Sequence, residues 1–113
     1  MDGPYIFNFT LNNIPDFTRD TLAINNKSIS DIDQFIFHQA NSFLINSLRL
    51  SLGIQESNFY NNITNTGNTV SCTIPIALKD YSKKISKKEN ILLNGFGVGL
   101  SMCAGTIEIE NEL

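Results

Sequence analysis

Segments with helical periodicity alternate with short apolar runs along this chain, and that alternation restricts the fold more than any other feature of the sequence. Apolar residues recur at helical spacing over residues 5–25, 41–52 and 70–81. Two runs that are typical of buried strands, 33–38 and 90–94, are interspersed with these segments, and an alternating strand pattern covers 106–110. The order predicts an α/β fold: a mixed, mostly parallel sheet layered with helices, in which functional residues gather where strands end.

Glycine and proline refine these boundaries. Gly53 follows the segment 41–52 at the position where a left-handed residue ends a helix. Pro15 should kink or divide the helix predicted over 5–25, and Pro75 is tolerable only in a first helical turn or as a kink. A basic stretch, 83–88, should end the last helix.

Two further segments carry local expectations. Phe59 and Tyr60 predict a short strand before the polar, turn-rich stretch 61–69. The glycines at positions 95, 97 and 99 predict a tight turn between two strands. This GFGVG segment resembles a phosphate-binding loop only superficially, because no lysine follows and the next pattern is a strand.

Composition limits the classes of function. The 113 residues fit one domain, with 42% hydrophobic and 17% charged residues. A net charge of −3 provides no basic stripe for a nucleic acid, and no apolar run approaches the roughly 20 residues that span a bilayer. We therefore expect a soluble, cytoplasmic protein that binds neither nucleic acid nor membrane.

The cysteines indicate neither a zinc site nor a disulfide framework. Cys72 and Cys103 lie far apart in the sequence, without a CxxC pattern or a neighbouring histidine. We expect both to be small buried residues, and no metal site is predicted.

Candidate catalytic residues are few. His38, the sole histidine, ends a predicted strand. Such a histidine is by itself more often a hydrogen-bonded structural residue than a catalyst. Asn68, in the GNT segment 67–69, is by itself more often a helix cap or a turn residue.

The motifs become specific in combination. HQAN at 38–41, GNT at 67–69 and GFGVG at 95–99, in this order, resemble the C-terminal domain of the β-ketoacyl-acyl-carrier-protein synthase III family, which are thiolase-fold condensing enzymes. The similarity extends through nearly the whole chain, from 1–3 and 7–9 onward. It implies that residues 1–113 form this one domain, as a fragment without the cysteine-bearing N-terminal half.

The resemblance implies an acyltransferase of fatty acid biosynthesis that catalyses a decarboxylative Claisen condensation. A cysteine of the N-terminal half would take an acyl group from coenzyme A, and malonyl-acyl carrier protein would lose carbon dioxide to form the attacking carbanion. His38 and Asn68 would donate hydrogen bonds to the malonyl thioester oxygen as charge develops there. Acyl-CoA and the malonyl carrier would be substrates, and no cofactor is implied.

The resemblance also implies lesser roles. Asn41 matches a position associated with the pantetheine arm, and Gly3 and Phe7 match the region around its path. Gly97 and Val98 would lie in the loop whose backbone helps to form the oxyanion hole. Implied partners are acyl carrier protein and the missing N-terminal half, with a homodimer as the full-length assembly.

The sequence departs from the family pattern at the helix after HQAN. Ser42 and Phe43 stand where an arginine that docks acyl carrier protein is common, and Arg49 is the local basic residue. Neither cysteine has the family's nucleophile context, so the isolated chain should be inactive. Two alternatives stay open: a specialised-metabolite acyltransferase of the same fold, and a noncatalytic thiolase-fold module for binding or dimerisation.

Overall fold

The computed structural model describes residues 3–38, 42–61, 73–85, 87–97 and 101–110. Its helices are α1 (Gly3–Ile24), α2 (Ser42–Leu52) and α4 (Thr73–Ser82). Its strands are β1 (Gln34–Phe37), β2 (Glu89–Gly97) and β3 (Ser101–Ile109). Two single 3₁₀ turns, Ile29–Asp31 and Glu56–Asn58, precede β1 and follow α2.

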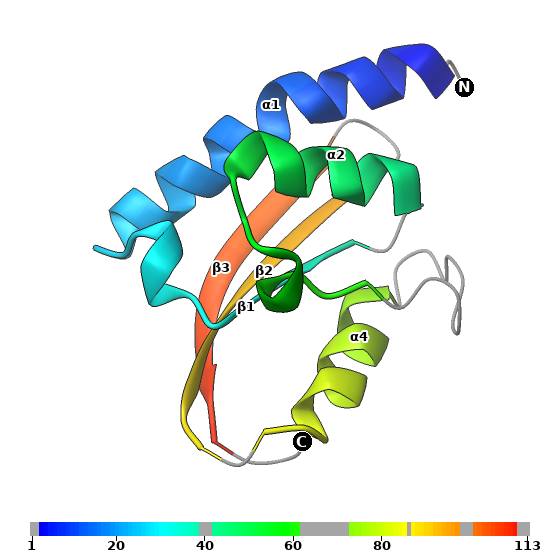
Figure 1. The fold of residues 1–113 in the computed structure, drawn as a ribbon. Helices are drawn as coiled ribbons and strands as arrows, with labels where there is room; N and C mark the ends of the chain where they lie inside the picture. The colour runs from blue at the N-terminus through cyan, green and yellow to red at the C-terminus, as the bar shows by residue number, and fades with distance from the viewer. Residues whose placement is uncertain (1–2, 39–41, 62–72, 86, 98–100, 111–113) are drawn as a thin grey trace.

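The strands form one sheet in the order β1-β2-β3, so that β2 lies in the middle (Figure 1). β1 pairs in parallel with β2, and Phe37 stands opposite Asn94. β2 pairs antiparallel with β3 from Glu89 opposite Ile109 to Gly97 opposite Ser101. The expected α/β fold with a mixed sheet is therefore confirmed, but among the described strands the longer pairing is antiparallel, so this sheet is not mostly parallel.

Helices cover both faces of the sheet. α1 and α2 pack together on one face, and α4 packs against β1 and β2 on the other (Figure 1). Side chains alternate along β1, where Phe35 and Phe37 face α1 and α2 while Ile36 faces α4. This alternation gives two apolar cores, as a sheet buried on both faces requires.

The predicted end of α2 is confirmed in detail. Gly53 has a φ of 71°, its N–H donates to the Leu50 carbonyl at 3.2 Å, and the Ile54 N–H donates to the Arg49 carbonyl at 3.1 Å. This pair of bonds is a Schellman motif, which satisfies the last carbonyls of a helix and favours glycine.

The prolines fit their helices in different ways. Pro75 is the third residue of α4, where a missing N–H leaves no helical bond unmade, as expected. Pro15 lies buried inside α1, which runs from Gly3 to Ile24 without division. The alternative in which Pro15 divides the helix is therefore wrong.

Three local expectations are corrected by the structure. Phe59 and Tyr60 do not form a strand: Phe59 makes one isolated parallel bridge with Phe35, and the Tyr60 N–H donates to the Phe35 carbonyl at 2.9 Å. The 3₁₀ turn that ends at Asn58 prevents the pairing from extending to the residues before Phe59. Gly95 and Gly97 belong to β2 and not to a turn. Cys103 is exposed on β3, an edge strand within the described sheet, whereas Cys72 lies outside the described residues.

Candidate active site

His38 directly follows β1, at the carboxyl end of the strand, as predicted. Its backbone N–H donates to the carbonyl of Asn94 at 2.9 Å, which continues the parallel ladder by one residue. The side chain is half-buried. The position of the histidine is therefore fixed by the middle strand as well as by its own.

The imidazole lies against an aromatic neighbour. The ring centroids of His38 and Phe96 are 5.3 Å apart, and the planes are inclined by 88° in an edge-on arrangement. Burial lowers the pKa of His38 below the ordinary value of 6.5. At neutral pH the ring is therefore uncharged, with one N–H donor and one acceptor nitrogen.

Parallel pairing brings several predicted site segments to one side of the fold. The carboxyl ends of β1 and β2 lie at the same edge of the sheet, so His38 and Gly97, the last residue of β2, end neighbouring strands. The first turns of α1, which include Gly3 and Phe7, and the beginning of α2 point toward the same side (Figure 1). His38 and the backbone of Gly97 thus lie on the same side of the fold as the beginnings of α1 and α2.

Five other predicted site residues have no described side chain. Asn41, Asn68 and Val98 lie outside the described residues. For Gly3 and Phe7 the structure gives only their place in the backbone of α1. The assignments of all five residues therefore stay predictions.

The residues around His38 include two that sequence reasoning missed. Phe96 contacts the imidazole, and Asn94 accepts the His38 N–H. Both belong to the GFGVG region and its approach, which the sequence assigned to a strand end and a turn. Only the register of β1 against β2 shows that they meet His38.

The beginning of α2 carries an exposed apolar side chain. Phe43 is 72% exposed, and Leu50, two turns later on the same helix, is 68% exposed. Arg49 is engaged elsewhere: its Nη1 donates to the Ile54 carbonyl at 3.1 Å. Arg49 thus stabilises the turn after α2, and it does not take the place of the docking arginine expected at the beginning of this helix.

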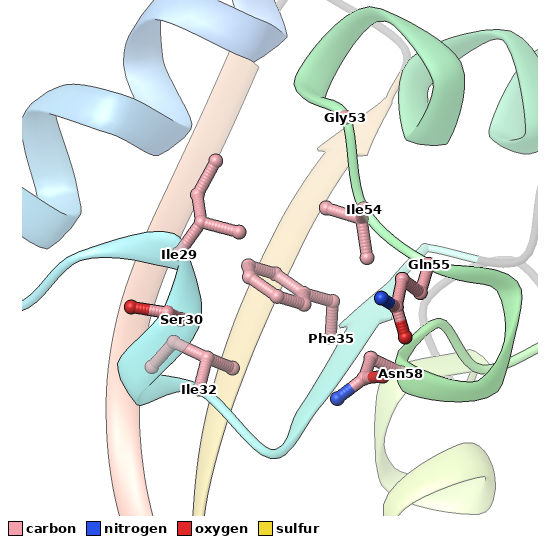
Figure 2. A pocket seen from close by; sticks show the side chains of 8 residues that line it. All are labelled: Ile29, Ser30, Ile32, Phe35, Gly53, Ile54, Gln55 and Asn58. Carbon is pink, nitrogen blue, oxygen red and sulfur yellow. The ribbon is translucent and has the colours of Figure 1, made fainter.

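A separate pocket of about 410 Å³ lies beside the start of β1 (Figure 2). Its lining is mixed: Ile29, Ile32, Phe35 and Ile54 contribute apolar side chains, and Ser30, Gln55 and Asn58 contribute polar residues. Asn58 is already bonded through Nδ2 to the Asp33 carbonyl at 3.1 Å. His38 and Phe96 do not line this pocket, so within the described part of the chain it is distinct from the candidate active site.

Among the helices in the described ranges, none combines the length and the apolar character needed to cross a bilayer.

The sequence matches a known family over most of its length. Residues 22–109 match the family described as 3-oxoacyl-[acyl-carrier-protein (ACP)] synthase III C terminal. The chain is 39% identical over 110 residues to β-ketoacyl-[acyl-carrier-protein] synthase III of Clostridium tetani, covering 96% of this chain and 33% of that protein. It is 36% identical over 103 residues to the synthase III of Pyropia yezoensis, covering 89% of this chain and 32% of that protein. The chain thus spans about a third of the length of these relatives.

Solved structures agree with this match. The 3-oxoacyl-(acyl-carrier protein) synthase of Burkholderia xenovorans superposes with a TM-score of 0.89 at 34% identity, covering 99% of this chain and 33% of that one. The priming β-ketosynthase of the R1128 polyketide pathway superposes with a TM-score of 0.93 at 27% identity, covering 100% of this chain and 35% of that one. The resemblance carried by HQAN, GNT and GFGVG is confirmed. The chain has a thiolase-like fold and belongs to the family of 3-oxoacyl-[acyl-carrier-protein] synthase III C-terminal domains.

Proposed function

We propose that this chain supplies the hydrogen-bond donors for malonyl decarboxylation and condensation in a synthase III type acyltransferase. His38 and Asn68 would donate to the malonyl thioester oxygen while carbon dioxide leaves and negative charge develops on that oxygen. A cysteine outside these 113 residues would carry the acyl group taken from acyl-CoA. The products would be coenzyme A, released when the cysteine is acylated, carbon dioxide and a 3-oxoacyl carrier.

The state of His38 is the observation that supports this proposal most directly. A donor for an enolate oxygen works best if it is held in place before the reaction and is shielded from water. The bond from the His38 N–H to Asn94 fixes the backbone, and Phe96 shields the ring. Because burial lowers the pKa of His38, the ring is neutral at neutral pH and carries one N–H that can act as a donor and one acceptor nitrogen.

The other predicted residues complete the proposal. Asn68 would supply a second donor that no change of pH removes, since an amide does not titrate in the working range. Asn41 would bind the pantetheine arm, with Gly3 and Phe7 near its path. Backbone N–H groups at Gly97 and Val98 would help to stabilise the oxyanion formed at the acyl-enzyme.

The proposed partners follow from the same reaction. Acyl carrier protein would deliver the malonyl group, and coenzyme A would deliver the starter acyl group, without a cofactor. The complete enzyme would act in fatty acid biosynthesis in the cytoplasm as a homodimer. The Clostridium tetani and Pyropia yezoensis relatives are both named β-ketoacyl-[acyl-carrier-protein] synthase III, and this name supports the carrier as partner.

One structural neighbour supports a second candidate function. The priming β-ketosynthase of the R1128 polyketide pathway matches the whole chain with a TM-score of 0.93. An enzyme of specialised metabolism could use the same His38 and Asn68 with an unusual starter acyl group. Product analysis with a panel of acyl-CoA starters separates the two candidates, because the second candidate requires turnover of an unusual starter acyl group.

The test uses a complete synthase that carries this chain, made by replacing the matching region of the Clostridium tetani relative. His38→Ala and Asn68→Ala should each lower carbon dioxide release roughly a hundred- to a thousandfold, which is the usual cost of one such donor. Both variants should still acylate the cysteine, and mass spectrometry of the acyl-enzyme measures this acylation. Asn12→Ala, an exposed asparagine on α1, is the matched control.

The result that would reject the proposal is equally defined. If both alanine variants release carbon dioxide at the rate of the Asn12→Ala control, His38 and Asn68 are not the decarboxylation donors. If the parent chimera folds and takes up the acyl group but never decarboxylates malonyl carrier, the noncatalytic binding module becomes the better description.

A further inference from the structure

Asn94 is a polar residue at a position where its neighbours along the strand are apolar. It lies on the middle strand, on the same face as Leu92 and Phe96, and it is 0% exposed. Its Nδ2 donates to the hydroxyl of Thr18 on α1 at 2.8 Å. Its Oδ1 is buried and has no hydrogen-bond partner within the described ranges.

This arrangement does not serve stability well. A buried acceptor left without a partner costs at least as much stability as a typical buried hydrogen bond contributes. An apolar pair of similar shape at positions 18 and 94 would therefore hold α1 to the sheet at least as strongly. What an apolar pair lacks is direction, because a hydrogen bond fixes the relative position of its groups and an apolar contact does not.

The bonds of Asn94 connect α1 to His38. Thr18 Oγ1 accepts from Asn94 and itself donates to the Ile14 carbonyl at 2.8 Å. On the other side, the Asn94 carbonyl accepts the His38 N–H at 2.9 Å. Asn94 is thus bonded through its side chain to α1 and through its backbone to the candidate catalytic histidine.

We propose that Asn94 is a positioning residue for His38: its bond to Thr18 sets the carboxyl end of β2 against α1 and thereby fixes where the imidazole lies. Phe96, two residues further along the same strand face, shields the ring and would move with Asn94. The consequence for turnover rests on the proposed function, whereas the consequence for the histidine ring does not.

The test compares variants that change this bond with variants that do not. Thr18→Val removes the acceptor at constant shape, and Thr18→Val/Asn94→Val replaces the whole polar pair by an apolar one. Thr18→Ser keeps the hydroxyl acceptor and should therefore keep the histidine signals and the kcat of the parent. Thr21→Val is the matched control, because the Thr21 hydroxyl donates only within α1, to the Phe17 carbonyl at 2.9 Å.

Two readouts are needed. His38 is the sole histidine, so its ring proton signals can be followed by NMR in the 113-residue chain without ambiguity. Thr18→Val and the double variant should shift these signals and raise the titration midpoint toward that of a solvated histidine. In the chimeric synthase the same variants should lower kcat about ten- to a hundredfold at unchanged KM, as a misplaced catalytic group does.

The double variant separates positioning from stability. It should unfold at the same temperature as the parent or at a higher one, and still show the altered histidine signals and the lower kcat. If it keeps the parent's signals and kcat, Asn94 does not position His38 and the proposal is overturned. If the signals shift as expected while the parent chimera fails to decarboxylate malonyl, the positioning role stands and the proposed function fails.

Discussion

The imidazole of His38 lies edge-on to the phenyl ring of Phe96, with centroids 5.3 Å apart and planes inclined by 88°. The two rings belong to different strands and meet because β1 and β2 pair in parallel with Phe37 opposite Asn94. Phe96 removes water from one side of the imidazole, which is in keeping with a His38 pKa that burial lowers.

The lowered pKa of His38 predicts a pH dependence of stability. In the unfolded chain the histidine takes up its proton near the ordinary value of 6.5, whereas the folded chain takes it up only at lower pH. The unfolded state therefore binds more protons in between, and the free energy of unfolding should fall as the pH falls from above 6.5 through the folded-state pKa. Below that pKa the contribution of His38 should be fully lost.

Urea unfolding at a series of pH values measures this effect. His38→Gln keeps a polar side chain without titration in this range, so the difference between parent and variant isolates the histidine from the carboxylates. Equal slopes for the two proteins between about pH 5.5 and 7.5, which is about one unit on either side of the pKa of an ordinary histidine, would show that His38 is not protected from protonation.

Phe43 is uncharged at a position where an arginine that docks acyl carrier protein is common. We therefore expect weak electrostatic docking of an acidic carrier protein at this position. The side chain is 72% exposed at the beginning of α2, so Phe43→Arg should be accommodated without loss of core packing. A positive charge near a helix N-terminus costs about 0.3–1 kcal/mol. We expect the variant to bind acyl carrier protein more tightly at low salt and to lose this gain as salt is added.

Leu50→Arg is the control for that experiment, since it adds the same charge to an equally exposed position at the far end of α2. Titration calorimetry at two salt concentrations gives both affinities. Equal gains in affinity for the two arginine variants would indicate general charge attraction. No gain in affinity for Phe43→Arg would show that the docking surface does not include this position.

The 113-residue chain by itself should form no ketoacyl product. Its two cysteines, Cys72 and Cys103, lie outside the nucleophile context of the family, and hydrogen-bond donors do not replace a covalent acyl acceptor. Incubation with labelled acyl-CoA and malonyl carrier should leave both cysteines without specific label. Specific labelling of either cysteine together with formation of product would contradict the proposal that the acyl group is carried by a cysteine outside these 113 residues.

The same chain should associate with itself at high concentration. Ile24, Phe43 and Leu50 are 81%, 72% and 68% exposed, and large apolar side chains favour association where they form a contiguous exposed patch. Light scattering should show a mass that rises with protein concentration. Phe43→Ser/Leu50→Ser should lower that mass, and a monomeric parent at all concentrations would show that these side chains do not associate.

Local patterns predicted those elements whose boundaries depend on neighbouring residues in the sequence. The end of α2 at Gly53 and the strand before His38 are of this kind. Gly95 and Gly97 were assigned to a turn because glycine disfavours strands, but both are paired to β3 in a continuous ladder. Pairing with a distant strand outweighed the local preference there, and the ladder is not visible in a local pattern.

The candidate site was predictable in the same measure. The position of His38 at a strand end followed from the sequence, and its catalytic role followed only from the family resemblance. The approach of Phe96 and the bond from Thr18 to Asn94 depend on register and helix placement, which no spacing in the sequence specifies. Polar Asn94 within an apolar strand was the one available signal.

The middle position of β2 also has a consequence for the order of folding. β3 begins at Ser101, soon after β2 ends at Gly97, whereas contacts between the start of β1 and β2, such as Asp33 with Asn90, join residues 57 apart in sequence. Closing the longer loop costs more chain entropy, so the antiparallel pair should form first and β1 should join it later. Stopped-flow measurements on Ile107→Val and Ile36→Val should therefore give a high φ-value for the antiparallel pair and a low one for β1. The histidine would then reach its place only in a late step, when the parallel ladder closes.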